Sequence, residues 1–140
     1  MDLMNKFNRI MVETKDMALA TSVNDTPNVR VINFLYNPTQ KGIVYFSSFK
    51  GLPKTVEFAQ NNRVAFTTIP TGNVEQVRVC NATVNKSKLT VYDLKEAFCS
   101  KYPDYEGLIS KAGNILEVFE IHFKEANVII DLGISGRVHL

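Results

Sequence analysis

The hydrophobic positions of the chain follow two periods, one helical and one typical of strands. Apolar residues recur every three or four positions over residues 3–14, which predicts an amphipathic helix. From residue 17 onward, short runs rich in Val, Ile, Thr, Phe and Tyr are separated by turn residues, as in antiparallel sheets. Strands are expected at residues 17–23, 28–37, 42–48, 63–69, 74–85, 88–94, 115–123 and 125–133.

Helical segments interrupt these strands. Residues 53–61 begin with a proline, which suits a first helical turn, and place Val56 and Ala59 toward the interior. A further helix is expected from about residue 93 to residue 101, and residues 105–113 form a helical turn. The strands outnumber and interleave the helices. The pattern therefore predicts a mainly β fold with peripheral α, a six- or seven-stranded antiparallel barrel with flanking helices.

Composition limits the class of protein. A chain of 140 residues suits a single domain, residues 1–140, and 45% hydrophobic with 21% charged residues is usual for a soluble globular protein. No apolar run approaches the roughly 18 residues of a membrane span, and the amino terminus lacks a signal-peptide pattern, so we expect a cytoplasmic protein without membrane contact. A net charge of +2 is too small to indicate a nucleic-acid partner.

No cluster of side chains predicts a metal site or a catalytic nucleophile. Cys80 and Cys99 have neither zinc nor redox spacing, and we interpret them as reduced thiols packed as small hydrophobic groups. His122 alternates with apolar residues on an expected strand, where a lone histidine is structural or solvated. We therefore expect no metal, and the catalytic residues stay unassigned.

The stretch FSSFKGLPK, Phe46–Lys54, joins an expected strand to an expected helix. It carries two hydroxyls, on Ser47 and Ser48, and two ammonium groups, on Lys50 and Lys54. The start of a helix presents unpaired backbone N–H groups and the positive end of the helix dipole, a combination that favours anions. The stretch therefore predicts a phosphate site on the rim of the barrel.

In its order and spacing with two other segments, this stretch resembles the pyridoxamine 5'-phosphate oxidase family, the FMN-binding split barrels. The other segments are Arg30–Asn33, in an expected strand, and Gln76–Val77, at the start of a later one. The likeness covers roughly residues 15–123. It implies a split β-barrel that forms one FMN-binding domain, and a homodimer in which the flavin lies in a groove between subunits.

The resemblance also implies roles for individual residues. The arginine of the first segment is expected near the FMN phosphate, Ser48 and Lys54 match the family's phosphate-binding hydroxyl and lysine, and the glutamine matches one near the flavin's polar edge. The alternatives are an exposed strand arginine, a solvated lysine and a cross-strand glutamine. The expected cofactor-binding residues are Arg30, Val31, Ile32, Asn33, Ser47, Ser48, Lys50, Lys54 and Gln76.

The sequence departs from the family pattern at several positions. Leu52 and Pro53 stand where the family has a serine and an arginine, so the phosphate site lacks one hydroxyl and one charge, which Ser47 and Lys50 are candidates to replace. Asn81 stands where a strand glycine is frequent, and asparagine is compatible with a bulge there.

A late Arg137-x-His139 echoes a pair that the true oxidase uses near its substrate. Here we expect no further strand to brace it, so the two residues are predicted to lie in a loose terminus.

The residues and the resemblance together favour an FMN-dependent oxidoreductase, a flavin-dependent reductase of a small molecule, with a nicotinamide or other small-molecule reductant as its partner. The alternative is a non-catalytic protein that binds a flavin or haem on the same barrel. An oligonucleotide-binding barrel is a third reading, based on aromatic residues such as Phe34 and Tyr45, but alternating aromatic residues on strands are more typical of a core.

Overall fold

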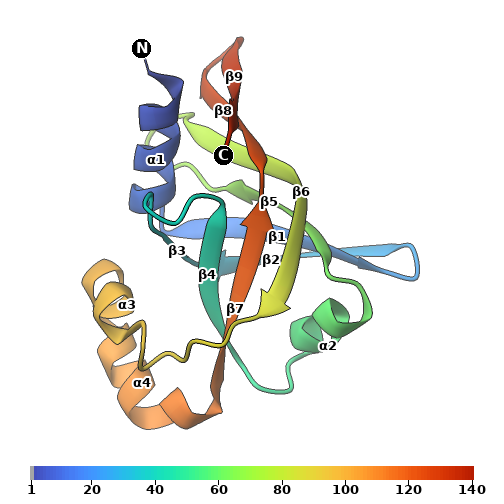
Figure 1. Cartoon of the computed structure of the whole chain (residues 1–140), viewed down its shortest axis with the longest axis vertical. Helices are drawn as coiled ribbons and strands as arrows, with labels where there is room; N and C mark the ends of the chain where they lie inside the picture. Colours follow the sequence, from blue (N-terminus) through green and yellow to red (C-terminus); the bar gives the residue numbers. More distant parts are fainter. Residues whose placement is uncertain (1) are drawn as a thin grey trace.

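Within residues 2–140, nine strands form one antiparallel sheet that curls into a half-barrel in the computed structural model of the chain (Figure 1). The structure describes residues 2–140. The strands are β1 (Asp16–Val23), β2 (Thr26–Asn33), β3 (Leu35–Tyr36), β4 (Ile43–Phe49), β5 (Arg63–Thr68), β6 (Gln76–Lys86), β7 (Leu116–Phe123), β8 (Glu125–Asp131) and β9 (Ile134–His139). Their order is β2-β1-β5-β6-β7-β4-β3, and β8 pairs with β6 and β9. The predicted mainly β, antiparallel class is confirmed, with more strands than the six or seven expected.

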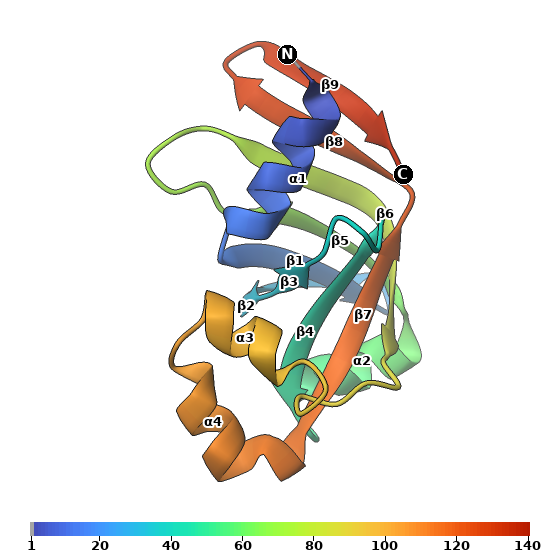
Figure 2. The same ribbon diagram turned by 60° about the vertical axis from the view of Figure 1, so that its left-hand side comes forward.

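The helices lie on the outside of this sheet. They are α1 (Leu3–Glu13), α2 (Pro53–Gln60), α3 (Lys95–Lys101) and α4 (Tyr105–Ala112), followed by a 3₁₀ turn, η1 (Gly113–Ile115). Figures 1 and 2 show α1 beside the β8–β9 hairpin, and α3 and α4 together at the other end of the molecule. Within residues 2–140, no helix is long and apolar enough to cross a bilayer.

Strand β7 separates two apolar clusters. Phe119 faces the interior of the barrel, where its ring stacks on that of Phe46 at 5.5 Å and meets the edge of Phe58 from α2. Leu116 and Val118 point to the opposite side of the sheet and pack under α3 and α4. The strand expected at residues 115–123 is confirmed, and each face of it covers a different core.

Three expected elements differ for identifiable reasons. Residues 88–94 form turns instead of a strand, because Thr90 and Asp93 exchange side-chain to backbone hydrogen bonds of 2.8 and 3.3 Å that compete with sheet pairing. The expected strand 28–37 breaks at Phe34, whose backbone N–H and C=O bind the Tyr102 hydroxyl. In α2 the inward residue is Phe58, whereas Val56 and Ala59 are exposed, so that prediction was wrong.

The bulge with which Asn81 is compatible is present. The β5–β6 register pairs Val64 with Ala82 and Phe66 with Val79, so β6 carries one more residue than β5 between these pairs. The Asn81 side chain accepts a hydrogen bond of 3.0 Å from the guanidinium of Arg63.

Candidate functional site

A pocket opens between β2 and β4, at the seam where the two sides of the curled sheet approach without a hydrogen-bonded ladder. Its volume is about 200 Å³. It is lined by Val31, Ile32, Asn33, Ser47, Ser48, Phe49, Leu52, Lys54, Tyr105, Leu108 and Leu116. This seam pocket therefore contains six of the nine residues that the sequence predicts for cofactor binding.

The path of the chain at the end of β4 explains how the polar groups meet. Gly51 adopts a φ of +79°, a left-handed conformation that favours glycine, and the chain turns there into α2. Pro53 occupies the first helical turn, so Lys54 follows at once beside the pocket. Burial lowers the pKa of Lys54, and the nearby charge of Arg30 lowers it further. A bound anion would favour the charged ammonium and so oppose both effects.

The two serine hydroxyls have only weak partners within the chain. Ser48 is buried, and its Oγ donates a long 3.4 Å hydrogen bond to the adjacent Phe49 carbonyl. The Ser47 Oγ lies 3.4 Å from the hydroxyl of Tyr105. No side chain caps the start of α2, because Leu52 occupies the N-cap position. Hydroxyls, an ammonium group and an uncapped helix start thus converge on one small volume, a donor set that suits a phosphate.

Arg30 is held beside the seam pocket and does not line it. Its Nη2 donates to a carboxylate oxygen of Glu57 on α2, and its Nη1 donates to Thr21 Oγ1 at 2.9 Å. Both members of the ion pair are largely buried, with side chains 18% and 19% exposed. The chain itself therefore supplies a counter-charge to the arginine that the family resemblance places near the phosphate.

Lys50 and Gln76 lie outside the seam pocket in the protomer. Lys50 Nζ donates to the carbonyl of Asn114 at 3.3 Å, across the turn before β7. The Gln76 side chain accepts a hydrogen bond of 3.1 Å from Thr67 Oγ1, on the outer face of the sheet. A single protomer thus brings together the residues of β2, β4 and α2, and it leaves the predicted glutamine on another surface.

The structure adds pocket residues that the sequence did not indicate. Tyr105 and Leu108 come from α4 and form an apolar wall, in which the Tyr105 ring stacks on Phe98 at 4.7 Å. Burial raises the pKa of Tyr105, so it stays a neutral hydroxyl. No local signal identified these residues, because only the packing of α4 brings them to β4. Glu57 had a signal, since a carboxylate three residues after Lys54 lies on a neighbouring part of the same helix surface.

The outer surface of β2, β1, β5 and β6 carries mostly small side chains, with the exposed Arg78 opposite Thr67. The strand registers place Val31 beside Ala18 and Thr67, and Val29 beside Ala20 and Ala65. Val29 and Val31 are 63% and 61% exposed. Cys80 extends this small-residue face and is an exposed free thiol, so its expected burial was wrong; Cys99 is free and partly buried. The face adjoins the seam pocket through Val31 and carries Gln76 on its border.

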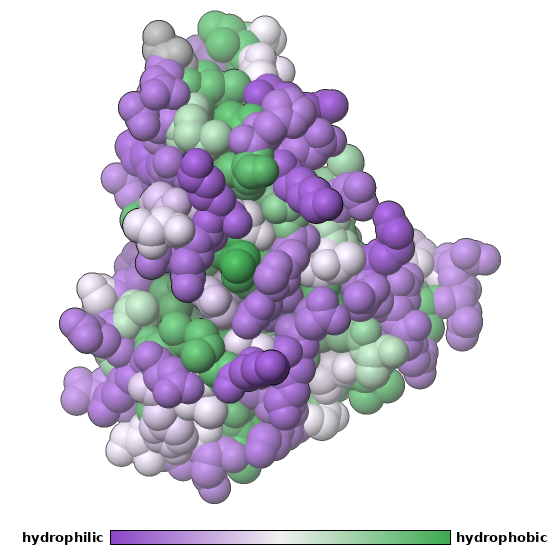
Figure 3. All heavy atoms as spheres, viewed as in Figure 1, coloured by the Kyte–Doolittle hydropathy of each residue, from purple (hydrophilic) through white to green (hydrophobic). Residues whose placement is uncertain are grey.

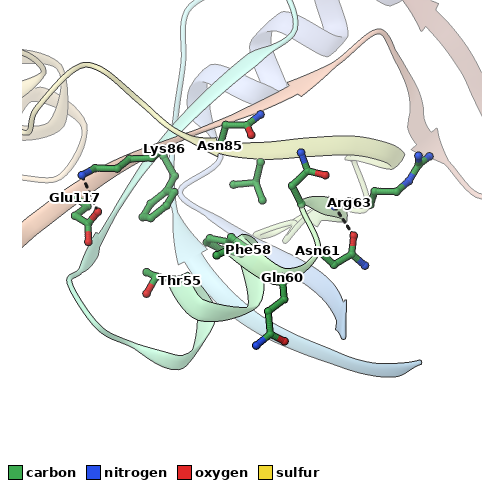
Figure 4. A pocket seen from close by; sticks show the side chains of 12 residues that line it. Thr55, Phe58, Gln60, Asn61, Arg63, Asn85, Lys86 and Glu117 are labelled. Carbon is green, nitrogen blue, oxygen red and sulfur yellow. Dashed lines mark hydrogen bonds and ion pairs between the residues drawn. The ribbon is translucent and has the colours of Figure 1, made fainter. Parts of the chain in front are cut away.

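A larger groove of about 680 Å³ lies elsewhere, between α2, the end of β6 and the start of β7 (Figure 4). Its floor contains Phe58 and Phe119, and its rim carries amides such as Asn85. Lys86 and Glu117 form a 3.1 Å ion pair at one end of it. None of the predicted cofactor-binding residues lines this groove.

The carboxy-terminal segment corrects the prediction of a loose terminus. Arg137 and His139 lie on β9, which pairs with β8 from Glu125 to Asp131. Both side chains are exposed and approach Glu125, at 3.8 and 3.6 Å, away from the seam pocket. The tip of this hairpin is apolar, and Leu132 is 90% exposed. Figure 3 shows a green, hydrophobic area at the top of the molecule, where Figure 1 places the hairpin.

Over residues 2–140, no three His, Cys, Asp or Glu side chains gather closely enough to hold a metal ion. His122 pairs with Glu120 at 2.7 Å on the exposed side of β7.

Comparison with known proteins identifies a family to which the chain is similar. Residues 10–135 match the model of the family described as pyridoxamine 5'-phosphate oxidase-like. No curated protein matches the chain. Among solved structures, a NimC/NimA family protein from Clostridium acetobutylicum is 18% identical, with a TM-score of 0.69 and coverage of 98% of this chain and 92% of that one.

Two further solved structures share the fold and have named cofactors. A FAD-binding protein from Mesorhizobium loti is 16% identical, with a TM-score of 0.64 over 95% of this chain and 90% of that one. A heme binding protein from Mycobacterium smegmatis is 11% identical, with a TM-score of 0.73 over 99% of this chain and 58% of that one. Since the family model covers most of its length, the chain belongs to the pyridoxamine 5'-phosphate oxidase-like family.

Proposed function

We propose that the protein is an FMN-binding oxidoreductase that reduces a small molecule, with the cofactor's phosphate held in the seam pocket. The observation that carries the proposal is the convergence of Ser47, Ser48 and Lys54 at the uncapped start of α2. FMN ends in a phosphate, which has acceptor oxygens for both hydroxyls and a negative charge for the ammonium group. These donors have few competing partners within the protomer.

The remaining pocket residues suit the rest of the cofactor. Val31, Ile32 and Asn33 on β2 supply an edge with backbone donors and acceptors, and Tyr105 and Leu108 supply an apolar wall on the opposite side. A bound flavin would provide the hydride and electron transfer, while these residues bind it, orient it and limit the access of water. No side chain of the chain is needed as a nucleophile.

The seam pocket of one protomer is too small for a whole flavin. Its volume of about 200 Å³ lies below the roughly 300–1,000 Å³ usual for cofactor-sized ligands. The small-residue face beside it exposes Val29 and Val31. A homodimer formed through this face would cover these valines and close the pocket, with Gln76 of the partner subunit as the amide at the flavin's polar edge.

The named cofactors of the similar structures define the alternative. The FAD-binding and heme binding proteins share the fold with this chain at 16% and 11% identity, so a non-catalytic flavin or haem carrier is the second candidate. The donor set favours the flavin, because His122 and His139, the histidines of the chain, are exposed, paired with glutamates and absent from the seam pocket.

The absorption spectrum of the purified protein, reconstituted with FMN or haem in parallel, tests this assignment. We expect a flavin spectrum after gel filtration with FMN, and bleaching of that spectrum when NADH or NADPH is added without oxygen. Retention of haem and not of FMN would contradict the proposal. Retention of FMN without reduction by any reductant, or without turnover of any electron acceptor, would identify the protein as a carrier.

A further inference from the structure

The ion pair between Arg30 and Glu57 is fixed by several contacts. Besides the arginine, Glu57 accepts hydrogen bonds of 3.4 Å from Thr21 Oγ1 and from the side-chain amide of Asn28. The other guanidinium nitrogen of Arg30 is occupied by Thr21 at 2.9 Å and by the carbonyl of Leu19 at 3.5 Å. The pair is therefore a built feature that joins α2 to β1 and β2, and it is not a loose surface contact.

This pair lies directly beside the phosphate end of the seam pocket. Glu57 follows Lys54 by three residues on α2, and Arg30 precedes the pocket residue Val31 on β2. Among the described residues that line the seam pocket, Lys54 is the only charged one. Arg30 and Glu57 carry opposite charges, so the three side chains together contribute a net charge of +1 at this end of the pocket.

We infer that Glu57 sets the charge of the phosphate end of the seam pocket, and so sets how strongly the site prefers a dianionic terminal phosphate. The inference rests on the proposed flavin site. The terminal phosphate of FMN carries about −1.5 to −2 charges at pH 7, whereas each phosphate of FAD carries one and riboflavin has none. Because the charge of Glu57 offsets that of Arg30, the site compensates one negative charge of the phosphate well and the second negative charge poorly.

The substitution Glu57→Gln tests this inference, because it removes the charge and keeps the size and hydrogen-bonding capacity of the side chain. We expect FMN to bind about tenfold more tightly to E57Q, the scale of one additional charge-assisted interaction. The gain for FAD should be smaller, and the affinity for riboflavin should not change. A damaged fold would weaken the binding of all three flavins. Tighter binding of the phosphorylated flavins alone would therefore be due to the loss of the Glu57 charge. Glu117→Gln is the matched control, since Glu117 is also a mostly buried carboxylate paired with a cation, in the larger groove.

A double-mutant cycle excludes the alternative that Arg30 contacts the phosphate and Glu57 only orients it. Arg30→Gln alone leaves the Glu57 carboxylate uncompensated beside Lys54 and should weaken FMN binding at least tenfold. R30Q/E57Q should recover nearly the wild-type affinity, because Lys54 again provides the net charge of +1.

Two other results would overturn the inference. An E57Q variant that binds FMN as weakly as the wild type or more weakly, with a double variant no better than R30Q, would show that Arg30 binds the phosphate directly. If no variant binds any of the three flavins in fluorescence titrations, the proposed function fails, and the inference fails with it.

Discussion

The seam pocket and the larger groove show that the size of a cavity and its chemistry are separate properties. The groove has more than three times the volume, about 680 Å³ against 200 Å³, yet its ionic groups already have partners. Lys86 pairs with Glu117, and Arg63 donates to the Asn81 side chain. In the seam pocket no carboxylate of residues 2–140 pairs with the ammonium of Lys54, and the serine hydroxyls make only long contacts. A ligand site is therefore better identified by polar groups without strong partners than by volume.

The largest expected effect on FMN binding comes from a substitution on the small-residue face, through which a homodimer would close the seam pocket. Val29→Glu places a charge on a side chain that is already exposed in the protomer, so the fold should persist. In a homodimer formed through this face the same charge is buried without a partner. We expect light scattering to show a dimer for the wild type and a monomer for V29E, with FMN affinity reduced about a hundredfold or more.

Leu132→Glu, at the exposed hairpin tip away from this face, is the control and should remain dimeric. A wild-type monomer that binds FMN normally would show that the seam pocket needs no second copy.

The comparison between the two cavities is sharpened by removing one lysine from each. Lys54→Ala should weaken FMN binding by about 10- to 100-fold, since a charge-assisted contact contributes about 1.5–3 kcal/mol, and should leave riboflavin binding nearly unchanged. Lys86→Ala, in the larger groove, should alter neither. Isothermal titration calorimetry measures both. Loss of affinity in K86A with no loss in K54A would move the cofactor to the larger groove.

A half-buried lysine on α3, Lys101, gives a prediction on stability. Lys101 Nζ donates to the Phe34 carbonyl at 2.9 Å and lies 4.1 Å from the centre of the Phe34 ring. Burial, with a smaller contribution from the charge of Lys15, lowers the pKa of Lys101 to about 8 from 10.5. The unfolded chain therefore binds more protons than the folded one between pH 8 and 10.5, so stability should rise with pH in that window.

The measurement is urea unfolding of the wild type and Lys101→Met at pH 7.5 and 9.5. The wild type should gain about 1–2 kcal/mol relative to the variant over this interval. Identical pH dependence in the two proteins would mean that Lys101 is hydrated and titrates normally. Ionisation of tyrosines contributes equally to the two proteins, so it cancels in the difference between them.

The smallest expected effect concerns the α4 wall of the seam pocket. Tyr105→Phe removes a hydroxyl that makes one long contact, 3.4 Å to Ser47, and keeps the ring stacked on Phe98. We expect FMN affinity to change by less than about threefold, because neutral hydrogen bonds of this length contribute little. A loss as large as that of K54A would mean that the Tyr105 hydroxyl itself contacts the cofactor.

Periodicity and local chemistry account for the parts that were predictable from the sequence. The helix at residues 3–13, most strands and the convergence of Ser47, Ser48 and Lys54 follow from local patterns, because each depends on residues close in the chain.

The rest depended on contacts between distant segments. Tyr102 splits the expected strand 28–37 from a position 68 residues away from Phe34, and Tyr105 enters the pocket from α4. The strand β9 is stabilised by pairing with β8 and by packing of Leu3 against Gly136, which its short sequence does not reveal. Arg30 illustrates the same limit for the site, since its motif was evident, but its pairing with Glu57, 27 residues further along the chain, emerged only from the fold.

The most direct test of the central claim is a calorimetric comparison of FMN and riboflavin binding to the wild-type protein in the same buffer. The two ligands share the ring and the ribityl chain and differ only in the terminal phosphate. If the seam pocket is a phosphate-terminated flavin site, FMN should bind at least tenfold more tightly. Equal affinities would contradict a role for Ser47, Ser48 and Lys54 in holding the phosphate.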